Sequence, residues 1–144
     1  FGVYQTTVDG FFTSYIYPQE NGNRTDVRWM SIVDGAGIGL LAAGAPTLDF
    51  SARRYTDSDL EKAQHLSDLA PRDFITLNLD YRQNGLGSNS CGPAQSPENT
   101  VTPEAFRFRI LLQAYMAEDS SPERLSRRMS IEAMQHEMEE NKHA

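Results

Sequence analysis

The chain has 144 residues and a net charge of -7 at pH 7, a length that suits one domain with its own core and is too short for two ordinary domains. The negative charge argues against nucleic acid and against an anionic membrane as partners, because both attract basic surfaces. No apolar run approaches the length that spans a bilayer, so we expect neither a nucleic acid nor a membrane among the partners.

The first third of the chain predicts β structure interrupted by turns. Residues 1–12 are interpreted as a connecting segment with at most a short strand, and residues 13–17 as a strand that Pro18 ends by removing a backbone donor. A polar turn follows around the strong turn pair Asn21-Gly22. Further strands are expected at residues 27–33, with apolar groups buried on both faces, and at residues 38–43 and 47–53.

The pattern then changes from strand to helix and back. Thr56 is a plausible helix N-cap, with Asp59 in the place of a capping-box acid, and the helix ends before Pro71. Residues 75–81 and 105–113 alternate between apolar and polar side chains, the period of a strand with one buried face. We therefore predict a mostly β body of antiparallel strands joined by hairpins, with one short helix as a crossing.

The end of the chain predicts a helix of a different kind. Ser120 with Glu123 three residues later resembles a helix start, and a narrow apolar stripe follows: Leu125, Met129, Ala133, Met134 and Met138. Such a helix docks loosely or frays. Three methionines also suit an adaptable partner surface, but we prefer an extension that lies on its own domain or is disordered. We place a domain boundary here, with residues 1–113 as the β domain and 114–144 as a C-terminal extension.

A glycine-rich loop follows the strand at residues 75–81. It contains Gly85, Gly87, Gly92 and Pro93, and it is held at its root by a rigid strand, which is the usual place for a binding residue. Taken alone, the pattern fits a long hairpin connection with flexible glycines better than a binding loop, since long loops are uncommon but need not be functional.

Four motifs, which occur in the same order along the chain as in one known family, resemble that family and favour the binding loop over the flexible connection. DYRQNGLGSNSCG (residues 80–92) is similar to the signature of the C-terminal small-chain domain of β-galactosidases in glycoside hydrolase family 2. Three more stretches agree in the same order: YIYPQENGNR with VRW (15–24, 27–29), GAP with FSA (44–46, 50–52), and YT with DL (55–56, 59–60). The likeness runs from about Val3 to about Leu112.

The resemblance implies a fold and a substrate loop. The fold is an antiparallel sandwich, part of a galactose-mutarotase-like supersandwich. In the family, the glycine loop reaches the catalytic barrel and lends a tryptophan as an apolar platform for the sugar. The matching loop residues here are Gly87, Ser88, Asn89, Ser90 and Cys91. Cys91 stands where the tryptophan is expected and offers no flat face; Arg53 and Arg54 are weaker departures from the pattern.

The resemblance assigns no chemistry of its own to this chain. The family's two catalytic glutamates and its Mg and Na ligands belong to the barrel domain, so we assign no catalytic residue, no metal ligand and no cofactor here. Glu20 lies most firmly inside a matched motif, and we expect it to be a turn residue that accepts backbone N–H bonds. The histidines, His65, His136 and His143, are too dispersed for a metal set.

Three functions follow, in order of preference. The first is a C-terminal segment of a β-galactosidase that hydrolyses terminal β-D-galactosides, completing the active site of a barrel outside this chain. The second is a stand-alone carbohydrate-binding or interaction module without catalysis, and the third a small mutarotase-type enzyme. The expected partners are a β-galactoside sugar, the rest of the β-galactosidase polypeptide and further copies of the chain, because a half-sheet leaves strand edges and apolar faces open. For localisation we favour the cytoplasm, although no motif assigns it.

Overall fold

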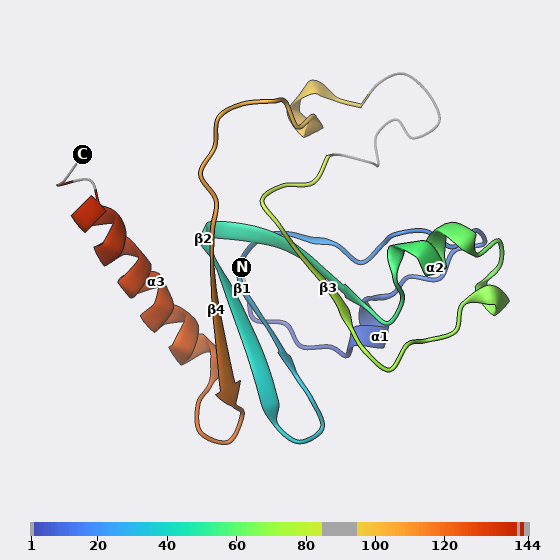
Figure 1. The fold of residues 1–144 in the computed structure, drawn as a ribbon, viewed down its shortest axis with the longest axis horizontal. Helices are drawn as coiled ribbons and strands as arrows, with labels where there is room; N and C mark the ends of the chain where they lie inside the picture. The colour runs from blue at the N-terminus through green and yellow to red at the C-terminus, as the bar shows by residue number, and fades with distance from the viewer. Residues whose placement is uncertain (1, 85–94, 141, 143–144) are drawn as a thin grey trace. The chain divides into compact units, whose positions relative to one another are not determined.

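The computed structural model describes residues 2–84, 95–140 and 142 (Figure 1). Its elements in chain order are α1 (Val8–Phe11), β1 (Arg24–Val33), β2 (Ile38–Arg53), α2 (Asp57–Lys62), η1 (Leu66–Asp68), β3 (Thr76–Asp80), η2 (Pro97–Asn99), β4 (Arg109–Met116) and α3 (Pro122–Glu140). The strands form a four-stranded sheet in the order β1-β2-β3, in which β4 also pairs with β2. The predicted fold class is confirmed: the protein is mostly antiparallel sheet with few helices and a C-terminal helix, consistent with a β-sandwich.

The chain divides into two compact units that share the long strand β2. The first unit comprises Phe1–Thr25 and Asp49–Leu79, and the second comprises Asp26–Leu48 and Asp80–Ala144.

In the second unit, a tight turn joins β1 to β2. The Asp34 carboxylate accepts hydrogen bonds from the backbone N–H groups of Ala36 (2.9 Å) and Ile38 (2.8 Å). Gly37 adopts a positive φ of 84°, which a residue with a Cβ rarely does. β4 then adds to β2 in antiparallel register, from Ile38 opposite Met116 to Ala45 opposite Arg109.

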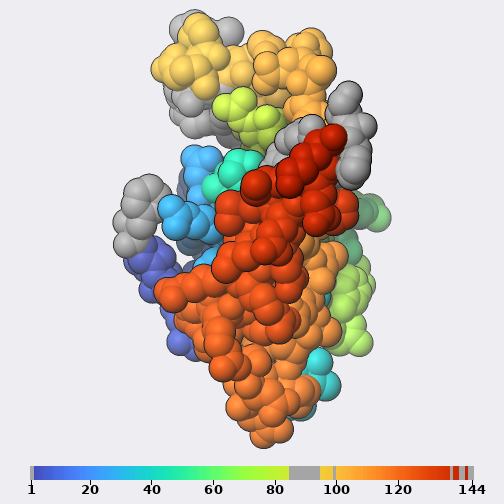
Figure 2. Space-filling view, turned by 90° about the vertical axis from the view of Figure 1, so that its left-hand side faces the viewer, coloured from blue at the N-terminus to red at the C-terminus, as the bar shows by residue number. Residues whose placement is uncertain are grey.

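The helix α3 docks on one face of these strands. Leu125 and Met129 pack against Leu41 and Ala43 of β2, and Trp29, Leu111 and Tyr115 surround this cluster. Figure 2 views the molecule from the side of α3, whose atoms run from orange to red. Arg128 also donates a hydrogen bond to the Gln113 side chain of β4, at 3.1 Å. The helix predicted from residue 120 is confirmed, and its first turns are attached to the sheet.

Only part of the predicted apolar stripe on α3 is buried. Leu125, Met129 and Ala133 are buried, whereas Met134 and Met138 are 56% and 63% exposed. The stripe therefore changes from a packing surface to an exposed one along the helix. The domain boundary at residues 113 and 114 stays a prediction.

In the first unit, aromatic and helix-cap contacts organise the chain. Phe11 meets Phe50 edge-on, with ring centroids 5.6 Å apart. The predicted capping box of α2 is confirmed: the Thr56 hydroxyl accepts from the Asp59 N–H (3.1 Å), and the Asp59 carboxylate accepts from the Thr56 N–H (2.9 Å). Leu60 is the buried residue of this short helix.

Two strands predicted in the first half of the chain differ from those in the structure. Residues 13–17 form no strand: the backbone N–H of Thr13 bonds to the Asn21 side chain at 2.8 Å, and the apolar side chains of residues 15–17 are exposed. The strand predicted at residues 27–33 exists as β1, but the expected burial on both faces is wrong, because Met30 is its one buried residue.

Two further differences concern strand boundaries. The separate strands predicted at residues 38–43 and 47–53 are one strand, β2, which continues through a cis peptide bond between Ala45 and Pro46. The strand predicted at residues 105–113 begins only at Arg109, because Phe106 and Phe108 pack on the Tyr81 ring instead, at centroid distances of 4.5 and 5.5 Å. None of the described helices combines the length and hydropathy needed to cross a membrane.

Candidate functional site

The loop that the sequence singles out, Gly87, Ser88, Asn89, Ser90 and Cys91, lies outside the described residues. The residues on either side of it are described. The Asn84 side-chain oxygen accepts hydrogen bonds from the Gln95 side chain (2.7 Å) and from the Val101 N–H (3.0 Å). One amide therefore ties together the two points at which the chain enters and leaves this stretch.

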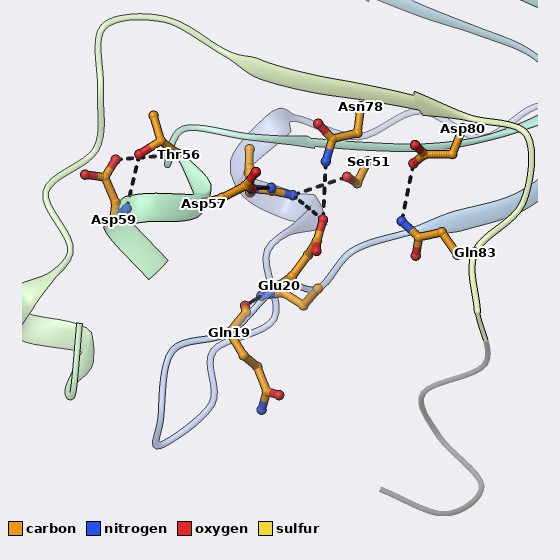
Figure 3. Close-up of polar contacts among 11 residues, drawn as sticks. Gln19, Glu20, Ser51, Thr56, Asp57, Asp59, Asn78, Asp80 and Gln83 are labelled. Carbon is orange, nitrogen blue, oxygen red and sulfur yellow. Dashed lines mark hydrogen bonds and ion pairs between the residues drawn. The ribbon is translucent and has the colours of Figure 1, made fainter. Parts of the chain in front are cut away.

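In the first unit, four polar residues surround one buried arginine; we call these five residues the Arg53 cluster. Its members are Glu20, Ser51, Arg53, Asp57 and Asn78 (Figure 3). The Arg53 guanidinium donates to Glu20 (2.9 Å) and to Ser51 (3.3 Å), and it forms an ion pair with Asp57. Asn78 of β3 donates to the same Glu20 oxygen at 3.2 Å. Side chains from four separate segments thus meet in one cluster around a single cation.

The local structure explains how these side chains meet. Ser51 and Arg53 are two residues apart on β2, so they share one face of the strand. Asp57 opens α2 four residues after Arg53, where its carboxylate also suits the positive end of the helix. Glu20 comes from the turn around Gly22, whose φ is 79°. The prediction that Glu20 accepts backbone N–H bonds is wrong, because its described partners are the side chains of Arg53 and Asn78.

Burial sets the electrostatic character of the cluster. The Arg53 side chain is 3% exposed, whereas those of Glu20 and Asp57 are 49% and 80% exposed. A buried guanidinium is costly unless it is paired, and here two carboxylates reach it from the solvent side. The cluster therefore holds its cation inside the protein and its two anions at the surface.

A second ion pair flanks the cluster on α2. The Arg72 guanidinium donates to both carboxylate oxygens of Asp59, at 3.0 and 2.5 Å. These bonds, followed by the bond from the Thr56 N–H, hold the pKa of Asp59 well below its usual range, and Asp59 in turn raises the pKa of Arg72. A carboxylate this firmly ionised cannot act as a general acid, so we assign Asp59 a structural role.

The described residues do not fit a metal site. They contain no group of three or more His, Cys, Asp or Glu side chains placed to hold an ion. The family resemblance places the Mg and Na ligands in the barrel domain, outside this chain, and we derive no step from these ions. His65 lies 3.7 Å from Asp68, which caps its own turn through the N–H groups of Gln64 and His65.

Arg53 is the residue that sequence analysis treated only as a departure from a family pattern. A signal was present, because Asp49, Ser51 and Arg53 alternate with Leu48, Phe50 and Ala52 in a run that proves buried on both faces. A polar residue at every second position of a buried strand indicates an internal polar cluster.

Comparison with known proteins matches the sequence to one family. Residues 1–112 match the family model described as Beta galactosidase small chain. The chain is 38% identical over 87 residues to a Beta-galactosidase of Priestia megaterium, covering 60% of the chain and 8% of that relative. It is 35% identical over 113 residues to a Beta-galactosidase of Vibrio cholerae and 33% over 118 residues to one of Arthrobacter sp., covering 78% of the chain in each case.

The matched region is a small part of these relatives. The chain spans 8%, 10% and 12% of the three proteins, respectively. The family match nevertheless covers more than three quarters of the present sequence, including the four motifs and the glycine-rich loop. The chain belongs to the β-galactosidase small-chain family.

Proposed function

We propose that the chain serves as the small-chain domain of an enzyme that hydrolyses terminal β-D-galactosides, and that it has no turnover alone. The observation that carries this proposal is the family match over residues 1–112, in which relatives named Beta-galactosidase align with one small part of a long polypeptide. In this role, residues 87–91 contact the sugar while the remainder of the enzyme supplies the catalytic groups and the metals.

The chemistry of the described residues supports a binding role over a catalytic one. Glycoside hydrolysis commonly requires two carboxyl groups that face the scissile bond, one of them with a raised pKa. Glu20 and Asp57 are instead paired with Arg53, and Asp59 is held ionised by Arg72. These acids stabilise the turn around Gly22 and the start of α2, so we assign none of them a catalytic role.

The root of the loop also supports this role. Asn84 joins residue 95 and residue 101 through hydrogen bonds of 2.7 and 3.0 Å, so the points of entry and exit are fixed on the second unit. A binding loop with fixed ends loses less entropy when it meets a ligand than one with free ends. Cys91 has no flat face, so we expect weaker sugar binding than a tryptophan at this position would give.

A chimeric enzyme tests the proposal. The matching segment of the Priestia megaterium relative is replaced by residues 1–112 of this chain, and hydrolysis of nitrophenyl β-galactoside is measured. The chimera is expected to be active, and the 144-residue chain alone inactive. In the chimera, Cys91→Trp is expected to lower KM several-fold, whereas Cys91→Ser is not. A folded but inactive chimera, or turnover by the chain alone, would contradict the proposal.

A further inference from the structure

A shallow pocket opens in the first unit, beside the Arg53 cluster. Its volume is about 370 Å3, and its walls come from residues 17–20 and from α2. Small-molecule sites range from about 300 to 1,000 Å3, so this pocket has room for one ring and not for a long ligand. All of its described lining residues belong to the first unit.

The walls combine an apolar surface with hydrogen-bond acceptors. Tyr17, which is 56% exposed, stands with Pro18 and Leu60, both of which are buried. Gln19, Glu20, Asp57 and Glu61 supply the polar part of the lining. An aromatic ring beside carboxylates suits a ligand that has a C–H face on one side and hydroxyl donors on the other.

Acceptor oxygens remain available on the carboxylates. One oxygen of Glu20 receives both described hydrogen bonds, from Arg53 and Asn78, and one oxygen of Asp57 receives the bond from Arg53. The second oxygen of each has no described partner and can accept a ligand hydroxyl. Because Arg53 is buried and fixed, both carboxylates are held in place before a ligand arrives.

The negative charge of the pocket restricts which classes of ligand it can bind. Its described lining residues include the carboxylates of Glu20, Asp57 and Glu61 and no cationic side chain, so phosphates and other anions are repelled. A metal ion is disfavoured because the described residues form no metal-binding group. An uncharged molecule with several hydroxyl groups satisfies both conditions.

We propose that this pocket binds one neutral monosaccharide unit. Tyr17 lies against the C–H face of the ring, and Glu20, Asp57 and Glu61 accept hydrogen bonds from its hydroxyl groups. The proposal goes beyond the function proposed above, because it needs neither residues 87–91 nor galactoside hydrolysis and concerns a site built wholly from described residues of the first unit.

Nuclear magnetic resonance of the full chain tests the proposal directly. The backbone amides are followed while galactose, glucose and lactose are added separately to about 50 mM, a range that detects millimolar binding. Saturable shifts at residues 17–20 and 57–61 with at least one sugar are the expected result. Absence of saturable shifts at these amides with all three sugars overturns the proposal, as does a response to calcium chloride in place of the sugars.

Matched variants locate the binding. Tyr17→Ala and Glu61→Gln change exposed side chains of the lining, and each is expected to raise the dissociation constant of the sugar by about tenfold. Tyr15→Ala and Glu118→Gln change exposed residues outside the lining and are expected to leave it unchanged. Equal weakening by a control variant, or none by either lining variant, overturns the proposal.

Discussion

At the scale of single residues, Arg53 connects several segments of the first unit. Its guanidinium fork reaches two carboxylates and a hydroxyl from the strand, the turn and α2 at once. A lysine ammonium is a point charge on a flexible stem and cannot reproduce that fork. The side chain of the neighbouring Arg54 is 38% exposed; it donates a hydrogen bond to the Arg72 carbonyl at 3.1 Å and lies 3.7 Å from the Asp9 carboxylate.

Arg53→Lys is therefore expected to lower the free energy of unfolding by about 1–3 kcal/mol, because charge-assisted bonds to a buried group are lost. Arg54→Lys, the matched control, is expected to cost less than about 0.5 kcal/mol. Urea unfolding followed by circular dichroism measures both. Equal losses of unfolding free energy in the two variants would show that the guanidinium of Arg53 contributes no more to stability than that of Arg54.

The carboxyl of Asp59 predicts a pH dependence of stability. Its pKa is lower in the folded protein than in the unfolded chain, so its contribution is fully present above the unfolded pKa of about 3.9 and is lost as the pH falls below that value. Asp59→Asn is expected to lower the melting temperature at pH 7. The difference in melting temperature between this variant and the parent chain is expected to narrow as the pH falls from about 4 to 2.

Thermal unfolding monitored at several pH values checks this expectation. Asp119→Asn is the control, because Asp119 lies exposed in the turn before α3. The role given to the ionised Asp59 carboxylate would be contradicted if the difference in melting temperature between Asp59→Asn and the parent chain stayed constant down to about pH 2.

At the scale of elements, the C-terminal helix is part of the second unit. Leu125 and Met129 are buried against β2, while Met138 on the same helix is exposed. The two methionines therefore make a matched pair, with the same side chain in two environments. Their contrast decides whether the helix is docked in solution.

Met129→Ala is expected to lower the free energy of unfolding by about 2–5 kcal/mol, the usual cost of emptying a buried site. Met138→Ala is expected to change it by less than about 0.5 kcal/mol. Chemical denaturation of both variants provides the measurement. If α3 were detached from the strands, the two substitutions would be equally neutral.

The sequence predicts which segments form strands better than it predicts where each strand begins and ends. Alternation located β1, β2 and β3, and capping chemistry located α2, because these signals are local. The segment at residues 13–17 has β-rich composition but no partner strand, and Phe106 and Phe108 continue an alternating pattern while packing on Tyr81. Such outcomes depend on contacts between residues far apart in sequence, which alternation cannot reveal.

The same limit applies to the sites. The Arg53 cluster depends on Glu20 and Arg53, 33 residues apart, meeting in space. Nothing in the spacing of Glu20 indicates that meeting, so its role as a turn residue was the natural but wrong inference. The loop at residues 87–91 rests on the family resemblance, and its contact with a sugar stays a prediction.

At the scale of the whole molecule, the sheet has an apolar surface on the side away from α3. Leu111 and Tyr115 of β4 pack with the α3 cluster, so Leu112 and Met116 point to the opposite face. Ile38 pairs with Met116 across the strands, and Ile38 and Leu112 are 56% and 59% exposed. An apolar sheet face left in water is prone to association with a second surface.

The chain is therefore expected to form dimers or larger species at moderate concentration, and Leu112→Lys is expected to shift it toward the monomer. Met138→Lys introduces the same charge at an exposed site on α3 and serves as the control. Light scattering coupled to size-exclusion chromatography measures the mass. A sharp monomer for the parent chain would contradict the expectation.

The amide of Asn84 bears on which changes the segment after it can tolerate. Because one side chain fastens the chain before and after residues 85–94, substitutions or length changes between those points need not disturb β3 or β4. The ten residues 85–94, which include Cys91, can therefore be exchanged together as one segment. Under the proposed function, exchanging this segment on an unchanged frame is expected to change which glycosides the enzyme accepts.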